Sequence, residues 1–183
     1  MPSIRATDGT RIFYDTFGKT NGEPLVLIMG LAVDRWGWLR QRAMLAKHFR
    51  CISIDNRGAG LSDKPTGKYD LFTMADDVEL VMDAEGIESA HIVGYSLGGV
   101  LSQVLAVRSP QRVRSLVLAS TACRVKDWRR EVLAEWIQLV EARGARVFSQ
   151  ENLRWVAAAR HMRWIAPLAP AFAPLLVRAP AHG

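Results

Sequence analysis

The nine residues His91-Ile-Val-Gly-Tyr-Ser-Leu-Gly-Gly99 decide how this chain is interpreted. They join a short apolar run, typical of a strand buried in a sheet, to a helical pattern through the sequence Gly-x-Ser-x-Gly. In such a tight turn the serine adopts a strained backbone conformation, and the flanking glycines let strand and helix approach closely. We therefore predict Ser96 as a nucleophile and Gly94 and Gly98 as the glycines of its turn.

The environment predicted for Ser96 favours a developing negative charge. The serine would lie at the N-terminus of the following helix, where the helix dipole and the backbone N–H of Leu97 point toward it. A second N–H donor is expected from the loop after the first buried strand, Met29-Gly-Leu-Ala32, and we assign it to Leu31. The alternative for this loop is a glycine-assisted exit from the strand without a catalytic part.

The rest of the first two thirds of the chain alternates strands and helices. Residues 3–17 form a predicted hairpin around Asp8-Gly9, and helices are expected over Trp36–His48, from a cap at Thr73 to Gly86, and over Leu97–Ser109. Short apolar runs typical of buried strands lie at residues 25–29, 51–55, 90–94 and 115–119. This order predicts an α/β fold with a mostly parallel sheet and helices on both faces.

Beyond Thr121 the pattern changes. Amphipathic helices are predicted over residues 127–143 and 151–164, and residues 174–178 are the one candidate for a further strand. We therefore predict two parts, a sheet domain at residues 1–121 and a helical, cap-like segment at residues 122–183. The tryptophans of this segment have two interpretations. They could line a pocket for an apolar portion of a substrate, or they could simply pack in the hydrophobic core of the segment.

Composition narrows the classes of partner. The net charge is +6, but the arginines of the last third are spread singly among apolar residues, so we predict no nucleic-acid partner. The chain has no run of about 18 apolar residues that would span a membrane and no apolar leader, and we expect a cytoplasmic protein.

No cofactor or metal is predicted. Cys51 and Cys123 have no metal-binding spacing and are expected to be reduced and mostly buried. A dinucleotide fingerprint beginning at Gly58 lacks its third glycine, because position 63 is Asp, and the stretch before Lys68 lacks the first glycine of a phosphate-binding loop.

The segments LVLIMG (25–30), IDNRGAGLSDKP (54–65) and residues 75–121 resemble the α/β-hydrolase superfamily of serine esterases, lactonases and thioesterases. The resemblance covers about two thirds of the chain. Within the superfamily the chain is similar to the enol-lactonase and methylesterase type, whose DxRGxGxS segment matches the residues Asp55, Arg57, Gly58, Gly60 and Ser62. In the family this segment shapes the loop near the active site, which implies a structural role for Asp55.

The chain departs from the family pattern in two places. Met29-Gly30 stands where many relatives have His-Gly, which matters little because the donor is a backbone N–H. The family also carries an acid and a histidine after the serine, beyond the cap. Only His161 and His182 follow Ser96 here, and we interpret both as surface or cap residues. The general base is left unassigned, and the chain is predicted to be truncated before the C-terminal strands.

Two hypotheses of function follow. In the first, the chain is a serine hydrolase that cleaves a carboxylic ester, lactone or thioester through an acyl-enzyme on Ser96, with a small molecule as its substrate. In the second, it is a truncated and inactive hydrolase-like domain. That domain would act as a binding or oligomerising module, or would receive its acid and histidine from a second chain.

Overall fold

The computed structural model describes residues 2–124, 126–128, 130–139 and 142–143. The chain divides into two units, Met1–Cys123 and Arg124–Gly183, and each is described by itself. Their predicted roles as hydrolase core and cap remain predictions.

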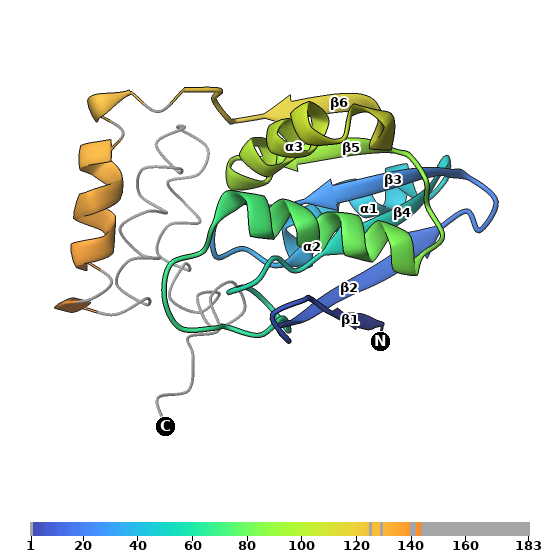
Figure 1. Cartoon of the computed structure of the whole chain (residues 1–183). Coiled ribbons are helices and arrows are strands. Elements are labelled where there is room, and N and C mark those ends of the chain that lie inside the picture. Colours follow the sequence, from blue (N-terminus) through green and yellow to red (C-terminus); the bar gives the residue numbers. More distant parts are fainter. Residues whose placement is uncertain (1, 125, 129, 140–141, 144–183) are drawn as a thin grey trace. The chain divides into compact units, whose positions relative to one another are not determined.

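The first unit is built on one sheet, whose described strands are listed here in chain order: β1 (Ser3–Arg5), β2 (Arg11–Gly18), β3 (Glu23–Ile28), β4 (Phe49–Ile54), β5 (Ala90–Tyr95) and β6 (Val113–Ala119). Their order across the sheet is β1-β2-β4-β3-β5-β6 (Figure 1). The hairpin strands β1 and β2 are antiparallel to each other, and β2 is antiparallel to β4. The remaining pairs are parallel. The four apolar runs of the sequence are therefore β3, β4, β5 and β6, which lie side by side in one mostly parallel sheet, as the predicted fold requires.

Helices cover both faces of the sheet, as predicted. Helices α2 (Leu71–Ala84) and α3 (Leu97–Arg108) lie on one face, and the short α1 (Leu39–Leu45) lies on the other. Alternate side chains of β3 serve the two faces: Val26 and Ile28 join the core under α2 and α3, whereas Leu25 and Leu27 pack with Trp38 of the 3-10 turn η1 (Arg35–Trp38). This alternation follows from the two-residue period of a strand.

Helix α2 begins earlier than predicted. Its N-cap is Asp70, whose carboxylate accepts a hydrogen bond of 3.0 Å from the N–H of Thr73, so Thr73 lies inside the first turn and is not the cap. An aspartate is at least as good an N-cap as a threonine, and here it precedes the threonine by three residues. The predicted end is confirmed, because Gly86 follows the helix with a φ of +66°.

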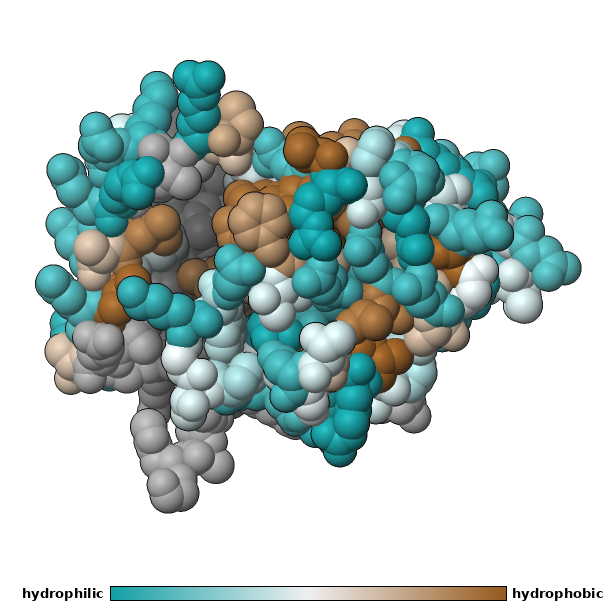
Figure 2. Space-filling view, in the orientation of Figure 1, coloured by the Kyte–Doolittle hydropathy of each residue, from teal (hydrophilic) through white to brown (hydrophobic). Residues whose placement is uncertain are grey.

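Strand β6 is not buried, contrary to the prediction for residues 115–119. Val117 is 53% and Leu118 is 43% exposed, and apolar side chains reach the surface over the side of the core formed by α3 and β6 (Figure 2). Among the described strands β6 pairs with β5 alone. Its apolar composition therefore predicted the strand correctly but not its burial.

Cys51 is buried and free, as expected, but Cys123 is exposed, which the sequence did not predict. Burial raises the pKa of the Cys51 thiol to about 11. The described residues between 127 and 143 are helical, which agrees with the predicted helix. The helix predicted over residues 151–164 and the candidate strand at residues 174–178 lie outside the described residues. No helix in the described part of the chain has the length and apolar character to cross a membrane.

Candidate active site

Ser96 lies in the turn between β5 and α3, where the sequence predicted it. Its φ of +52° and ψ of −114° lie outside the helical and strand regions, a conformation that is strained for any residue with a side chain. The backbone holds this geometry from both sides. The Ser96 N–H donates to the carbonyl of Ala119 at 2.9 Å, and the Ser96 carbonyl accepts from the N–H of Gly99 at 3.0 Å.

The two glycines of the turn allow a close approach of backbones. A Cβ on Gly94 would lie 2.6 Å from the Cα of Gly99, and one on Gly98 would overlap the carbonyl oxygen of Ile28. Any larger residue at either position would push α3 away from the sheet. The helix therefore starts directly on the ends of β3 and β5 because both residues are glycine.

The predicted oxyanion loop lies against the serine. A Cβ placed on Gly30 would be 3.2 Å from the Cβ of Ser96, so the loop backbone passes beside the side chain. Leu31 is exposed, and the loop turns through Ala32, whose φ is +58°, to a hydrogen bond of 3.3 Å from the Val33 N–H to the Gly30 carbonyl. The structure thus brings the segments that carry the predicted donors Leu31 and Leu97 to the same strand ends as Ser96.

Asp55 is fully buried, and its carboxylate is occupied by the protein. It accepts hydrogen bonds from the N–H of Arg35 and from the Arg35 guanidinium, both at 2.7 Å, and from the N–H of Leu61 at 2.9 Å. These contacts tie the loop after β3 to the loop after β4. They agree with the structural role that the resemblance implied for Asp55.

Two further polar residues of the same loop are buried: Ser62, which belongs to the matched segment, and Asn56, which the sequence did not single out. Asn56 donates from Nδ2 to the carbonyl of Met29 at 2.9 Å. Ser62 accepts from the N–H of Phe13 at 2.8 Å and donates to the carbonyl of Asp55 at 2.5 Å. Asn56 stands at a variable position of the DxRGxGxS pattern, so nothing in that pattern drew attention to it.

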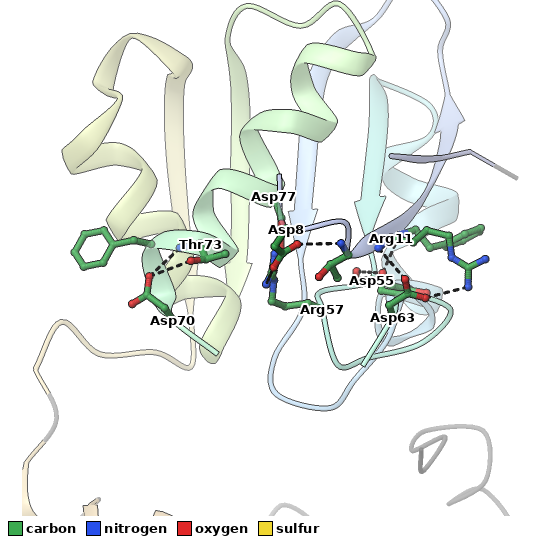
Figure 3. Close-up of polar contacts among 12 residues, drawn as sticks. Asp8, Arg11, Asp55, Arg57, Asp63, Asp70, Thr73 and Asp77 are labelled. Carbon is green, nitrogen blue, oxygen red and sulfur yellow. Dashed lines mark hydrogen bonds and ion pairs between the residues drawn. The ribbon is translucent and has the colours of Figure 1, made fainter. Parts of the chain in front are cut away.

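A buried ion pair anchors the loop to α2. Arg57 makes a two-pronged contact with Asp77 at 2.7 and 2.8 Å and a third contact with Asp8 of the hairpin at 2.8 Å (Figure 3). Burial raises the pKa of Asp77, although Arg57 pulls it in the opposite direction. Hydrogen bonds from Thr10, and then Arg57, hold the pKa of the exposed Asp8 well below its usual range.

The described histidines do not serve Ser96 as a base. His48 follows α1, and the ring of His91 is held at 2.7 Å from Ser115 Oγ and at 2.9 Å from Glu23. Ser96 follows His91 by five residue steps along an extended strand, a distance of about 16 Å. Within the described part of the chain, no hydrogen bond involves the Ser96 hydroxyl. His161 and His182 lie outside the described residues, and the base stays unassigned.

Comparison with known proteins agrees with this architecture. Residues 23–156 match the protein family described as alpha/beta hydrolase fold. The chain therefore belongs to the α/β-hydrolase family.

Individual relatives within the family differ in their chemistry. The chain is 29% identical to 3-oxoadipate enol-lactonase 2 of Acinetobacter baylyi over 84% of its own length and 54% of that protein. It is 34% identical to a non-heme chloroperoxidase of Streptomyces lividans over 66% of its length and 44% of that protein. The chain thus spans about half the length of these two curated relatives.

A solved structure shows the same fold. The enol-lactonase of Burkholderia xenovorans superposes with a TM-score of 0.86 at 29% identity, over 96% of this chain and 66% of that one. The resemblance that the sequence carried is thereby confirmed at the level of family and fold.

Proposed function

We propose that this chain carries the nucleophile of a serine hydrolase that acts on a carboxylic ester, lactone or thioester. The observation that carries the proposal is the setting of Ser96, a strained residue between β5 and a twelve-residue helix, with the Gly30 backbone against its side chain. A hydroxyl in this position faces the N-terminus of α3, where anionic transition states are stabilised.

In the proposed reaction, Ser96 Oγ attacks the carbonyl carbon of the substrate and its proton passes to a general base. The N–H groups of Leu31 and Leu97 donate to the oxyanion of the tetrahedral intermediate. This intermediate collapses, and the alcohol or thiol leaves with the proton and an acyl-enzyme remains. Water, deprotonated by the same base, then releases the acid and restores Ser96. Neither described histidine supplies the base, so it comes from outside the described residues.

The relatives favour a lactone or a simple ester within this class. Two of the proteins compared above are named enol-lactonases, and the exposed side chains beside the serine turn, Leu31 and Tyr95, are large and apolar or aromatic. A substrate with an apolar portion next to its carbonyl would cover them.

The test is covalent labelling. We expect the chain to gain one adduct, seen by intact mass, on incubation with a fluorophosphonate, and Ser96→Ala to lose it. Ser120→Ala is the matched control, because Ser120 has the same φ of +52° and follows the neighbouring strand β6, but within the described residues no helix starts directly after it. Equal labelling of wild type and Ser96→Ala would overturn the proposal, as would loss of the adduct in Ser120→Ala alone.

The exposed strand β6 favours a second candidate function, in which this face binds another chain. An apolar edge strand is a site for strand pairing, and a second chain bound there could supply the general base. We expect light scattering to show a concentration-dependent dimer that Val117→Lys abolishes. A chain that stays monomeric at all concentrations and still labels at Ser96 would exclude this candidate.

A further inference from the structure

Two consecutive residues, Asp55 and Asn56, hold the two ends of the loop that runs beside Ser96. Asp55 binds Arg35, at the far end of the loop, through both the backbone N–H and the guanidinium. Asn56 binds the carbonyl of Met29, at the near end. The segment between them, Gly30–Asp34, carries the N–H of Leu31.

The hydrogen bond between Asn56 and the Met29 carbonyl is buried, so neither group has an alternative partner in solvent. Both residues are 6% exposed, so water does not replace the Asn56 amide if it is removed, and the Met29 carbonyl would be left without that partner. The Met29 side chain is fixed as well, because it packs in the core with Trp38 and against Gly37. The peptide that precedes Gly30 is therefore set in one orientation.

Among the residues that the structure describes, no side chain is hydrogen-bonded to the next two peptides. Gly30 lies against Ser96, and the backbone from Gly30 to Val33 closes with one hydrogen bond of 3.3 Å, which is long for an N–H to carbonyl contact. The direction of the Leu31 N–H is therefore set by the Met29 peptide, from which only the two rotatable main-chain bonds of Gly30 separate it, and by Arg35 downstream.

We propose that Asn56 is a positioning residue for the oxyanion donor Leu31, acting through the carbonyl of Met29. This inference rests on the proposed function, because it gives Leu31 that role. Displacing a donor by about 1 Å lowers rates roughly a hundredfold, so the buried amide affects rate more than substrate binding.

The test compares Asn56→Leu with Ser62→Ala. Each substitution removes buried hydrogen bonds of the same loop, but Ser62 faces Phe13 and the Asp55 carbonyl and not the loop beside Ser96. Two readouts are taken: the rate constant of fluorophosphonate labelling at Ser96, with kcat and KM for an activated ester, and hydrogen exchange of the amides of residues 30–34. Asn56→Asp serves as a second variant of the same size, because a carboxylate cannot donate to Met29.

We expect both Asn56 variants to lower the labelling rate and kcat about tenfold to a hundredfold, to leave KM within about twofold, and to speed exchange at residues 30–34. Ser62→Ala should leave the labelling rate, kcat, KM and the exchange at residues 30–34 unchanged. Wild-type exchange in both Asn56 variants would overturn the inference, as would wild-type labelling in a background where Ser96→Ala is inert. If Ser96→Ala labels like wild type, the proposed function has failed instead, and exchange alone decides whether Asn56 orders the loop.

Discussion

Charged side chains differ in burial between the two ends of the parallel strands. In the loops that follow the carboxyl ends, Asp55 is fully buried and Arg35 and Arg57 are nearly so, as is Asp77 of α2, which binds Arg57. Two pairs at the amino ends face solvent: the side chain of Asp83, which binds Arg112 at 2.6 Å, is 57% exposed, and that of Glu23, which binds His91 at 2.9 Å, is 65% exposed.

This difference indicates that the buried charges serve to hold the loops in place more than to raise the free energy of unfolding. A buried ion pair loses in desolvation most of what it gains in attraction. Burial raises the pKa of Asp77, whereas the hydrogen bond to Asp77 raises the pKa of Arg57. Exposed pairs contribute little either way. What the buried pairs add is a fixed loop, and the loops that they fix surround Ser96.

Two aspartates of α2, Asp77 and Asp83, give the strongest test of this difference between the two ends of the sheet. We expect Asp77→Asn to lower the free energy of unfolding by about 3 kcal/mol, because it leaves the buried Arg57 with Asp8 as its remaining carboxylate. Asp83→Asn should lower it by less than about 1 kcal/mol, because Arg112 stays near solvent. Urea midpoints with unchanged slopes measure both.

Equal losses in the two variants would mean that burial does not separate the two ends of the sheet. A large loss in Asp83→Asn alone would reverse the comparison.

The sequence predicted some parts of the candidate site and not others. The turn at Ser96 was predictable, because Gly-x-Ser-x-Gly between a strand and a helix leaves few alternatives for the backbone. The resemblance indicated the structural role of Asp55. Asn56 could not be predicted, because its partner is a backbone carbonyl 27 residues away and a main-chain acceptor leaves no mark in the sequence. The exposure of β6 was missed because its apolar composition does not reveal whether a further strand lies beside it.

A contact of intermediate burial sharpens the comparison further. The Tyr14 hydroxyl donates to Glu85 at 2.8 Å, and Glu85 also binds Arg50 at the start of β4. We expect Tyr14→Phe to lower the free energy of unfolding by about 1 kcal/mol at pH 7, which lies between the effects of the two aspartate variants.

The pH dependence of Tyr14 gives an independent check. Burial, and then Glu85, raises its pKa from 10.0 to about 12, so the folded chain holds the phenolic proton more tightly than the unfolded chain does. The contribution is complete below pH 10 and is lost as the pH rises from 10 to 12. Denaturant titrations across this range should show a steeper loss in wild type than in Tyr14→Phe. Parallel curves would mean that the hydroxyl is not held as described.

The smallest effect is expected where the side chains look most catalytic. Ser115, His91 and Glu23 lie on adjacent strands and are hydrogen-bonded in series, which is the order of a serine, histidine and acid triad. Yet Ser115 lies within β6 and not at a helix start, and all three residues lie toward the amino ends of their strands. Glu23→Gln should therefore lower the free energy of unfolding by less than about 0.5 kcal/mol, with less effect at high salt.

Ser115→Ala should keep the full fluorophosphonate adduct. An adduct on Ser115, found by peptide mapping, would show that side-chain order alone suffices, and that the strained turn and helix N-terminus at Ser96 are not what makes a serine reactive in this fold.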